Sequence, residues 1–114
     1  MQPDKVFISA HARDFHRLSQ WWTQLLGRRW DREPMPNCHE WDLTRNVLFQ
    51  VLDGGDRAPA VVTMHVLDID AEIARLAALG FQIPDPVAVE GFATLRYCRF
   101  EDIEGNEVGL LDGE

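Results

Sequence analysis

An internal repeat constrains the fold of this chain more than any other feature of its sequence, because repeated units must share one architecture. A short apolar run, an aspartate, a helical stretch and a closing Leu-Gly occur in this order twice. The first copy consists of 6–10, Asp14 and 15–27, and the second of 61–66, Asp68 and 69–80. The two aspartates stand 54 residues apart, so the two copies together fill the 114-residue chain. This pattern predicts a tandem duplication.

Both helical stretches carry a single apolar stripe. Residues spaced three or four apart share one side of a helix. The stripes are Phe15, Leu18, Trp22 and Leu25 in the first helix, and Ile69, Ile73, Leu76 and Leu79 in the second. An aspartate before each stretch suits a helix N-cap, and a glycine after it suits a helix end. Each helix is therefore expected to cover one face of a sheet.

Segments of strand character follow each helix. They are 28–32, 38–43 and 47–52 in the first half, and 81–83, 93–100 and 107–111 in the second. Proline, glycine and asparagine mark the turns between them. With the two opening strands this predicts an α+β fold of two βαβββ units. The first unit spans about 4–53, the second about 60–112, and together they form one domain over 1–114.

Two local motifs carry a family resemblance. The first helix contains Trp21-Trp22 and ends in Leu26-Gly27, and Asp102-Ile103-Glu104-Gly105-Asn106 precedes the last strand. In this order, within a duplicated βαβββ pattern, they resemble the vicinal oxygen chelate superfamily of glyoxalases, bleomycin resistance proteins and extradiol dioxygenases. The small glyoxalase-like domain branch is the most similar. Members typically have Asp-Pro-x-Gly-Asn at the second motif, where this chain has Ile103. The resemblance implies a curved mixed sheet with a ligand cavity on its concave side.

The resemblance also implies where a metal would bind. Metal-dependent members carry one ligand on the first and one on the last strand of each half. Here these places fall on Phe7, Gln50, Val61 and Gly109, within one residue of register. Three of them have no donor side chain, and one amide oxygen does not hold a zinc or iron ion that requires three or more protein ligands. We therefore expect no metal cofactor.

Strand alternation predicts which side chains face the cavity, because residues i and i+2 lie on the same face. The expected ligand-binding residues are Phe7, Ser9, Trp41, Leu48, Gln50, Val61, Thr63, His65 and Gly109. They combine apolar surface with a few polar groups, as small-molecule sites do. Trp41 has two possible roles, as a wall of the cavity or as part of the core. The sequence thus predicts a metal-free small-molecule binding protein.

An enzymatic alternative stays open. A metal-dependent lyase or dioxygenase would need displaced ligands such as His11, Gln50, His65 and Glu107. A metal-free isomerase would use His65 as its base, since histidine exchanges protons near neutral pH. A strand histidine hydrogen-bonded to a neighbour, without a catalytic role, is the simpler explanation of His65.

The amino-acid composition excludes some classes of binding partner. The chain has 19 acidic and 11 basic residues and a net charge of −8, which disfavours nucleic acids and anionic membranes. No signal pattern is present at the N-terminus, so we expect a cytoplasmic protein. Cys38 and Cys98 lack CxxC partners and are expected to be reduced thiols. Four tryptophans, with Trp21 beside the helix stripe, favour a homodimer.

Overall fold

The structure of the protein is a computed structural model that describes residues 2–114. Its elements confirm the repeated βαβββ order. They are β1 (Val6–Ala12), α1 (Phe15–Leu26), β2 (Arg32–Met35), β3 (Cys38–Thr44), β4 (Val47–Asp53), β5 (Val61–His65), α2 (Ile69–Ala78), β6 (Val87–Ala88), β7 (Arg96–Glu101) and β8 (Glu107–Asp112). Within the described residues, no helix is long and apolar enough to cross a membrane.

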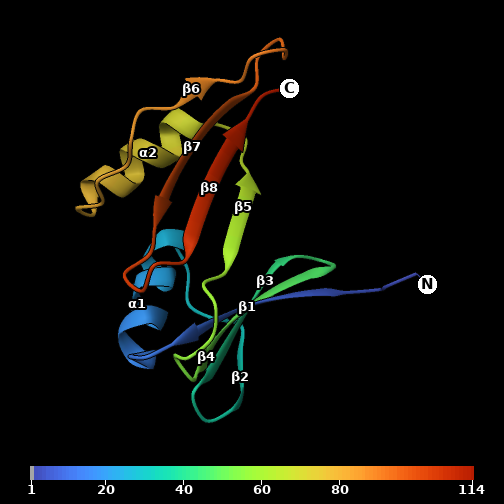
Figure 1. The fold of residues 1–114 in the computed structure, drawn as a ribbon, viewed down its shortest axis with the longest axis vertical. Helices are drawn as coiled ribbons and strands as arrows, with labels where there is room; N and C mark the ends of the chain where they lie inside the picture. Colours follow the sequence, from blue (N-terminus) through green and yellow to red (C-terminus); the bar gives the residue numbers. More distant parts are fainter. Residues whose placement is uncertain (1) are drawn as a thin grey trace. The chain divides into compact units, whose positions relative to one another are not determined.

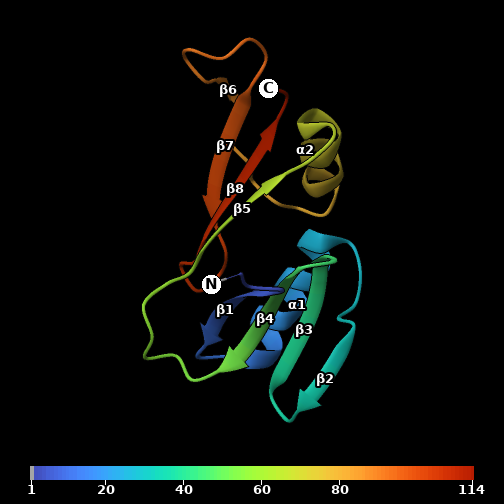
Figure 2. The same ribbon diagram turned by 90° about the vertical axis from the view of Figure 1, so that its right-hand side faces the viewer.

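The eight strands form two four-stranded sheets with the same topology. The strand orders are β1-β4-β3-β2 and β5-β8-β7-β6. The outer strand that opens each half pairs in parallel with the last strand of that half, and all other pairs are antiparallel. Figure 2 shows α1 against one face of the first sheet, and Figure 1 shows α2 beside the second. This confirms the α+β fold and the duplication.

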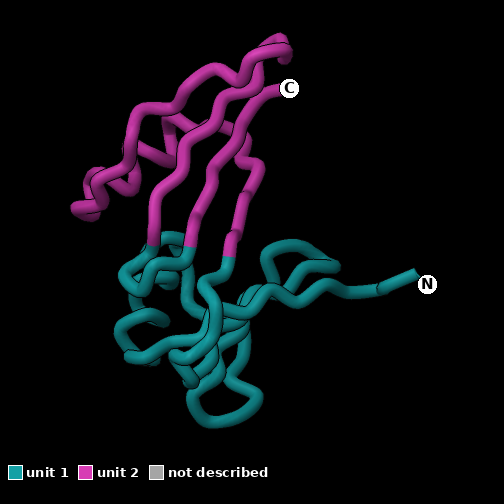
Figure 3. Tube along the Cα trace, in the orientation of Figure 1, with its two compact units in different colours: residues 1–60, 102–106 teal, residues 61–101, 107–114 magenta. Residues whose placement is uncertain are grey.

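The chain divides into two compact units (Figure 3). Unit 1 comprises the chain up to Ala60 together with Asp102–Asn106, and unit 2 comprises Val61–Glu101 and Glu107–Glu114. The two sheets therefore lie in different units. The turn between β7 and β8 is the exception, because its contacts place it in unit 1.

Unit 1 has an aromatic core between α1 and its sheet. The predicted stripe of α1 is buried, and Trp22 is fully enclosed. Its ring centroid lies 4.1 Å from that of Phe49, which in turn lies 5.9 Å from that of Trp41. Asp14 caps the helix by accepting from the Arg17 backbone N–H at 3.3 Å. Helix α1 ends at Gly27, whose φ of 75° is the left-handed conformation that glycine tolerates best.

Unit 2 is held together differently. Asp68 caps α2 through the Ala71 N–H, but of the predicted stripe only Ile69 and Leu76 are buried. The expectation for Leu79 was wrong, because α2 ends at Ala78 and the next side chain leaves the stripe, half exposed. A polar link anchors the start of α2 to the sheet. Asp112 on β8 accepts from the Ile69 N–H at 2.8 Å and from Arg96 on β7 at 3.1 Å.

Three predicted strand positions were wrong for identifiable reasons. The strand expected at 28–32 begins only at Arg32. The residues before it are linked to β3 mainly by side-chain hydrogen bonds, and their backbone contributes the bond from the Asp31 N–H to the Glu40 carbonyl. The strand expected at 81–83 is at 87–88, beyond two prolines that cannot donate to a ladder. The strand expected at 93–100 begins at Arg96, since the Thr94 N–H donates to Glu114 O instead.

Candidate functional site

The sheet of unit 1 has one face packed on α1 and an opposite face, here called the open face, on which Phe7 is exposed whereas Cys38 and Leu48 are buried. Phe49 and Trp41 contact the helix side, as their ring contacts with Trp22 and with each other show. Alternation then places the neighbouring residues of each strand on the open face. Register arranges them in three cross-strand rows, which are His11–Leu52–Cys38, Ser9–Gln50–Glu40 and Phe7–Leu48–Asp42.

The middle row forms a hydrogen-bonded ladder across all four strands. The Ser9 hydroxyl donates to Gln50 Oε1 at 2.8 Å, and Gln50 Nε2 donates to Glu40 Oε2 at 2.9 Å. Arg32 on β2 donates to Glu40 Oε1 at 3.3 Å. We call Ser9, Gln50, Glu40 and Arg32 the polar ladder. Glu40 is only 8% exposed, and its buried charge is compensated by Arg32 and by the amide of Gln50.

The ladder continues into a charged end on β3. Asp42 Oδ2 accepts from Arg32 at 2.5 Å, while its backbone N–H donates to Asp31 at 2.6 Å. The guanidinium of Arg28 donates to the Asp42 carbonyl and to Asp31. The hydrogen bond from the Asp42 backbone N–H, followed by that from Arg28, lowers the pKa of Asp31. The hydrogen bond to Asp42, followed by that to Glu40, raises the pKa of Arg32. Asp42 Oδ1 is enclosed and accepts no hydrogen bond from the described residues.

A second polar group lies on the helix side of the same sheet. Ser19 Oγ lies 2.5 Å from His39 Nδ1, and Glu33 Oε2 lies 3.1 Å from His39 Nε2. Trp30 stacks on the imidazole, with centroids 3.5 Å apart and planes at 7°. Burial lowers the pKa of His39 against the opposing effect of Glu33. Ser19 is 2% exposed, so this Ser-His-Glu arrangement is closed to substrates and is structural.

The open face of unit 2 holds the remaining predicted residues. Val61, Thr63 and His65 alternate along β5 and are all exposed. His65 Nε2 lies 2.9 Å from the carbonyl of Gly113. A carbonyl only accepts, so Nε2 is the protonated nitrogen and Nδ1 of the neutral ring is left as an acceptor.

Gly109 on β8 offers no room for a side chain. A Cβ placed there would lie 2.9 Å from Thr63 Oγ1 and 3.0 Å from Tyr97 Cε2. The Tyr97 ring therefore occupies the space beside this strand position. Close by, Arg99 pairs with Glu107 at 3.3 Å. These two residues, with Phe100 and Glu101, line a shallow depression of about 290 Å³.

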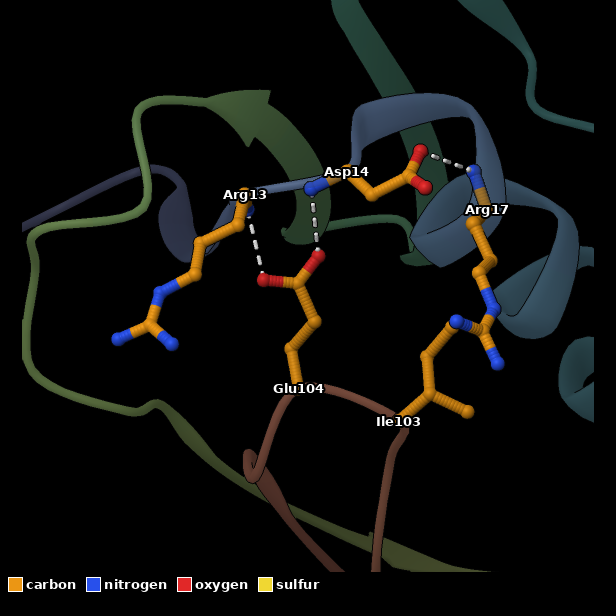
Figure 4. Close-up of a pocket in the computed structure, with 5 residues that line it drawn as sticks. All are labelled: Arg13, Asp14, Arg17, Ile103 and Glu104. Carbon is orange, nitrogen blue, oxygen red and sulfur yellow. Dashed lines mark hydrogen bonds between the residues drawn. The ribbon is translucent and has the colours of Figure 1, made fainter.

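Another depression, of about 230 Å³, lies at the start of α1 in unit 1 and is lined by Arg13, Asp14, Arg17, Ile103 and Glu104 (Figure 4). The Glu104 carboxylate accepts from the backbone N–H groups of Arg13 at 2.6 Å and Asp14 at 2.9 Å. The donors that an external anion would use are therefore already bonded. This depression is a docking point for the chain's own 102–106 turn.

The same turn is organised around Asp102. Asp102 accepts from the indole N–H of Trp22 at 3.0 Å and from the Asn106 side-chain amide at 2.7 Å. Its other oxygen accepts from the backbone N–H groups of Glu104 and Asn106. The turn does not need a proline at the position of Ile103, because these four hydrogen bonds fix its conformation.

The structure places the predicted site residues in two groups. Phe7, Ser9, Leu48 and Gln50 share the open face of unit 1, and Val61, Thr63, His65 and Gly109 share the open face of unit 2. Trp41 belongs to neither group. It is fully buried in the core, and its Nε1 donates to the Arg28 carbonyl at 3.1 Å, so the expectation of a cavity wall was wrong.

Sequence reasoning missed Arg32, Glu40 and Asp42. A signal for the last two was present: once Trp41 is assigned to the core, its neighbours on both sides must face the open side. Arg32 was not recognised because the strand that carries it was expected at 28–32 and not at 32–35. The cysteines match the prediction, since both are buried free thiols.

The residues do not fit the divalent metal centre of the superfamily. Phe7 and Val61 have no donor atoms, and Gly109 has no side chain. The one remaining oxygen, Gln50 Oε1, already accepts from Ser9. His11 and Gln50 belong to unit 1, whereas His65 and Glu107 belong to unit 2. Among residues 2–114, no three His, Cys, Asp or Glu side chains are grouped as metal ligands within either unit.

Comparison with known proteins identifies the family. The model of the glyoxalase-like domain matches residues 5–111. Among solved structures, a glyoxalase/bleomycin resistance protein from Catenulispora acidiphila superposes with a TM-score of 0.83 and 20% identity, covering 96% of this chain and 98% of that one. The fosfomycin resistance protein FosX from Listeria monocytogenes gives a TM-score of 0.76 and 13% identity, covering 100% and 96%.

A third similar structure is an antibiotic binding protein, TnmS3, from a Streptomyces species. It has a TM-score of 0.73 and 16% identity and covers 100% of this chain and 97% of that one. At these identities the solved structures support the fold alone. No curated protein matches the chain. The family match spans nearly the whole sequence and agrees with the duplicated βαβββ topology, so this chain belongs to the glyoxalase-like domain family of the vicinal oxygen chelate superfamily.

Proposed function

We propose that this protein binds a small organic molecule on the open face of unit 1, without a divalent metal between protein and ligand. The polar ladder is the observation that carries this proposal. It aligns four polar side chains across the sheet, beside the exposed apolar side chain of Phe7. A few oriented polar groups among apolar surface are typical of ligand sites.

Two further observations support a role in binding. Phe7 is 57% exposed beside the polar ladder, so its side chain is available to pack against an apolar part of a ligand. The similar structures include proteins whose names refer to antibiotic binding and to bleomycin and fosfomycin resistance. A binding protein of this kind sequesters its ligand unchanged, so it needs orienting groups but no reactive centre.

An NMR titration of the ¹⁵N-labelled full chain tests the proposal. Drug-sized organic compounds, bleomycin among them, are added in the presence of EDTA. We expect amide shifts at Ser9, Glu40 and Gln50 in the bound state. Gln50→Ala is expected to weaken binding about tenfold, because it removes hydrogen bonds at the centre of the ladder.

Gln20→Ala, at an exposed position of α1, is the matched control and should bind like the parent protein. Shifts confined to other surfaces, or binding that appears only after a divalent metal is added, would contradict the proposal.

A metal-free isomerase is the second candidate. The observation in its favour is that the protonated Nε2 of His65 donates to Gly113, which holds the ring and leaves Nδ1 able to accept a proton. No acid partner is bonded to Nδ1 in the described residues. The ladder gives the binding function the stronger support, and turnover of a bound ligand that is abolished by His65→Ala would reverse this order.

We further propose a homodimer in the cytoplasm. Val61, Val87 and Phe92 in unit 2 are each more than half exposed, and exposed aromatic and branched side chains are frequent at interfaces. Trp21, on which the sequence-based expectation relied, is half-buried with its ring 5.4 Å from that of Trp22. Light scattering at micromolar concentration should give twice the chain mass of 13.1 kDa.

A further inference from the structure

The polar ladder has a direction, and this direction decides what it offers to a ligand. The ionised carboxylate of Glu40 only accepts, so the Gln50 amide must present Nε2 to it and Oε1 to Ser9. The Ser9 hydroxyl donates its single hydrogen atom to the hydrogen bond with Gln50. Its oxygen is then left with free lone pairs. On β1, β3 and β4, the second N–H of the Gln50 amide is the only ladder donor that has no acceptor among the described residues. The face therefore favours ligands that donate hydrogen bonds.

Asp42 extends this excess of acceptors. Its side chain is 40% exposed, so a ligand can reach it. Arg32 satisfies Oδ2, whereas Oδ1 is turned inward and receives no donor from the described residues. A carboxylate oxygen without a donor and away from water is unfavourable.

The charges at this end of the sheet do not balance. Three carboxylates, those of Asp31, Glu40 and Asp42, face two guanidinium groups, those of Arg28 and Arg32. The cluster therefore carries one net negative charge, and the surrounding chain is acidic as well. A single positive charge on the ligand neutralises the net charge of the cluster, whereas an anion is repelled.

The exposed side chain of Phe7 lies at a suitable distance from Asp42, and Leu48 between them is buried. Asp42, Leu48 and Phe7 occupy one cross-strand row. Adjacent strands are about 4.8 Å apart, so the backbones at the two ends of the row are separated by about 10 Å. The exposed ring of Phe7 can pack on an apolar body or on the face of a cation.

We propose that the ligand of this face is an organic cation, with a protonated amine or guanidinium at Asp42 and an apolar or aromatic body over the row toward Phe7. This inference rests on the proposed binding function and adds the ligand's charge class. It assigns to Asp42 the role of selecting cations over neutral and anionic molecules of the same shape.

Three matched probes test it: 2-phenylethylamine as the cation, 2-phenylethanol as the neutral molecule and 3-phenylpropionate as the anion. Each is titrated into the ¹⁵N-labelled full chain at pH 7 and low salt. We expect the amine to bind at least tenfold more tightly than the other two, with amide shifts on β1 and β3. Asp42→Asn retains the size of the side chain and is expected to remove this preference.

Asp56→Asn removes the same charge from an exposed turn of unit 1 and serves as the control, expected to keep the preference. Unchanged indole signals of Trp22 and Trp41 verify that each variant is folded. Equal binding of all three probes at this face, or a preference for the anion, would overturn the cation inference and leave the binding function standing. Amine binding that Asp42→Asn does not weaken would also overturn it. No shift on this face with any probe, together with none in the compound screen, would remove both proposals.

Discussion

Units 1 and 2 share a topology but fill their cores with different side chains. Unit 1 buries Trp22, Trp41 and Phe49 between its helix and sheet. Unit 2 has no buried aromatic residue among those described, and its core consists of Val62, Ile69, Leu76, Cys98, Val108 and Leu110. The strand order and the parallel pair are nevertheless the same. The comparison teaches that alternation and helix periodicity specify this topology, whereas the identity of the core residues is free to diverge.

The two units also differ in charge. Unit 1 has ten acidic and eight basic residues, whereas unit 2 has nine acidic and three basic ones. All three arginines of unit 2 are paired, to Glu72, to Asp70 and Asp112, and to Glu107. In unit 1 charged side chains thus form a connected network beside one face of the sheet. In unit 2 the few arginines form ion pairs within α2, between α2 and the sheet, and between β7 and β8.

Replacing the central core residue of each unit gives the largest expected effects. Trp22→Ala should lower the free energy of unfolding by about 4 kcal/mol, since it removes a fully buried ring and leaves a large cavity. Leu76→Ala in unit 2 should cost about 3 kcal/mol, because a smaller side chain is lost. Urea denaturation measures both. An equal or larger loss for Leu76→Ala would show that the aromatic core is not the stronger one.

The bond between Trp22 and the 102–106 turn supplies the second test. Asp102→Ala leaves the enclosed indole N–H without its acceptor, which should cost about 2 kcal/mol. Asp56→Ala, in an exposed turn of the same unit, should change the stability by less than about 0.5 kcal/mol. Matching values for the two variants would mean that the turn contributes nothing to unit 1.

A pH dependence is expected from unit 1. Burial lowers the pKa of His39 in the folded protein, so the unfolded chain binds the proton first. The stabilisation is complete above about pH 6.5, the ordinary histidine pKa, and is lost as the pH falls from there through the lowered value. Urea midpoints at pH 7.5 and 5.0 measure the loss. His39→Gln should flatten this difference, and Trp30, stacked on the ring, provides a local fluorescence signal.

A difference between the two urea midpoints that His39→Gln leaves unchanged would contradict this assignment.

The smallest expected effect is that of metal removal. Phe7 and Gln50 in unit 1, like Val61 and Gly109 in unit 2, do not supply a set of metal donors. Dialysis against EDTA should therefore leave the thermal midpoint unchanged, and elemental analysis should find less than about one-tenth of an equivalent of zinc or iron. Near-stoichiometric metal with a lowered midpoint after chelation would refute this and favour the enzymatic alternative.

The repeat predicted the fold well because its signals are local. A capping aspartate, an apolar stripe and strand alternation each depend on a few neighbouring residues, so α1, α2, β3 and β4 were placed within two residues of their bounds. The edge strands β2 and β6 were misplaced because they are short and exposed. β2 is exposed along its length, and β6 is two residues long.

The candidate site was predicted only in part. Ser9 and Gln50 followed from alternation along their strands, but their hydrogen bond depends on the parallel pairing of β1 with β4. Arg32 meets Glu40 only because β2 begins four residues later than expected. Contacts between side chains on different strands require the register, and the register of a short edge strand has no signature in the sequence.

The 102–106 turn has a consequence for synthesis of the protein on the ribosome. The residues that bond to the N-terminus of α1 and to the indole of Trp22 lie between two strands of unit 2. The first 60 residues emerge without them, and the nascent first half waits for more than forty further residues before its last hydrogen bonds can form. Growing chains usually complete one folding unit before the next. Here the first repeat needs residues that are synthesised within the second, so the second repeat cannot be removed without leaving unit 1 incomplete.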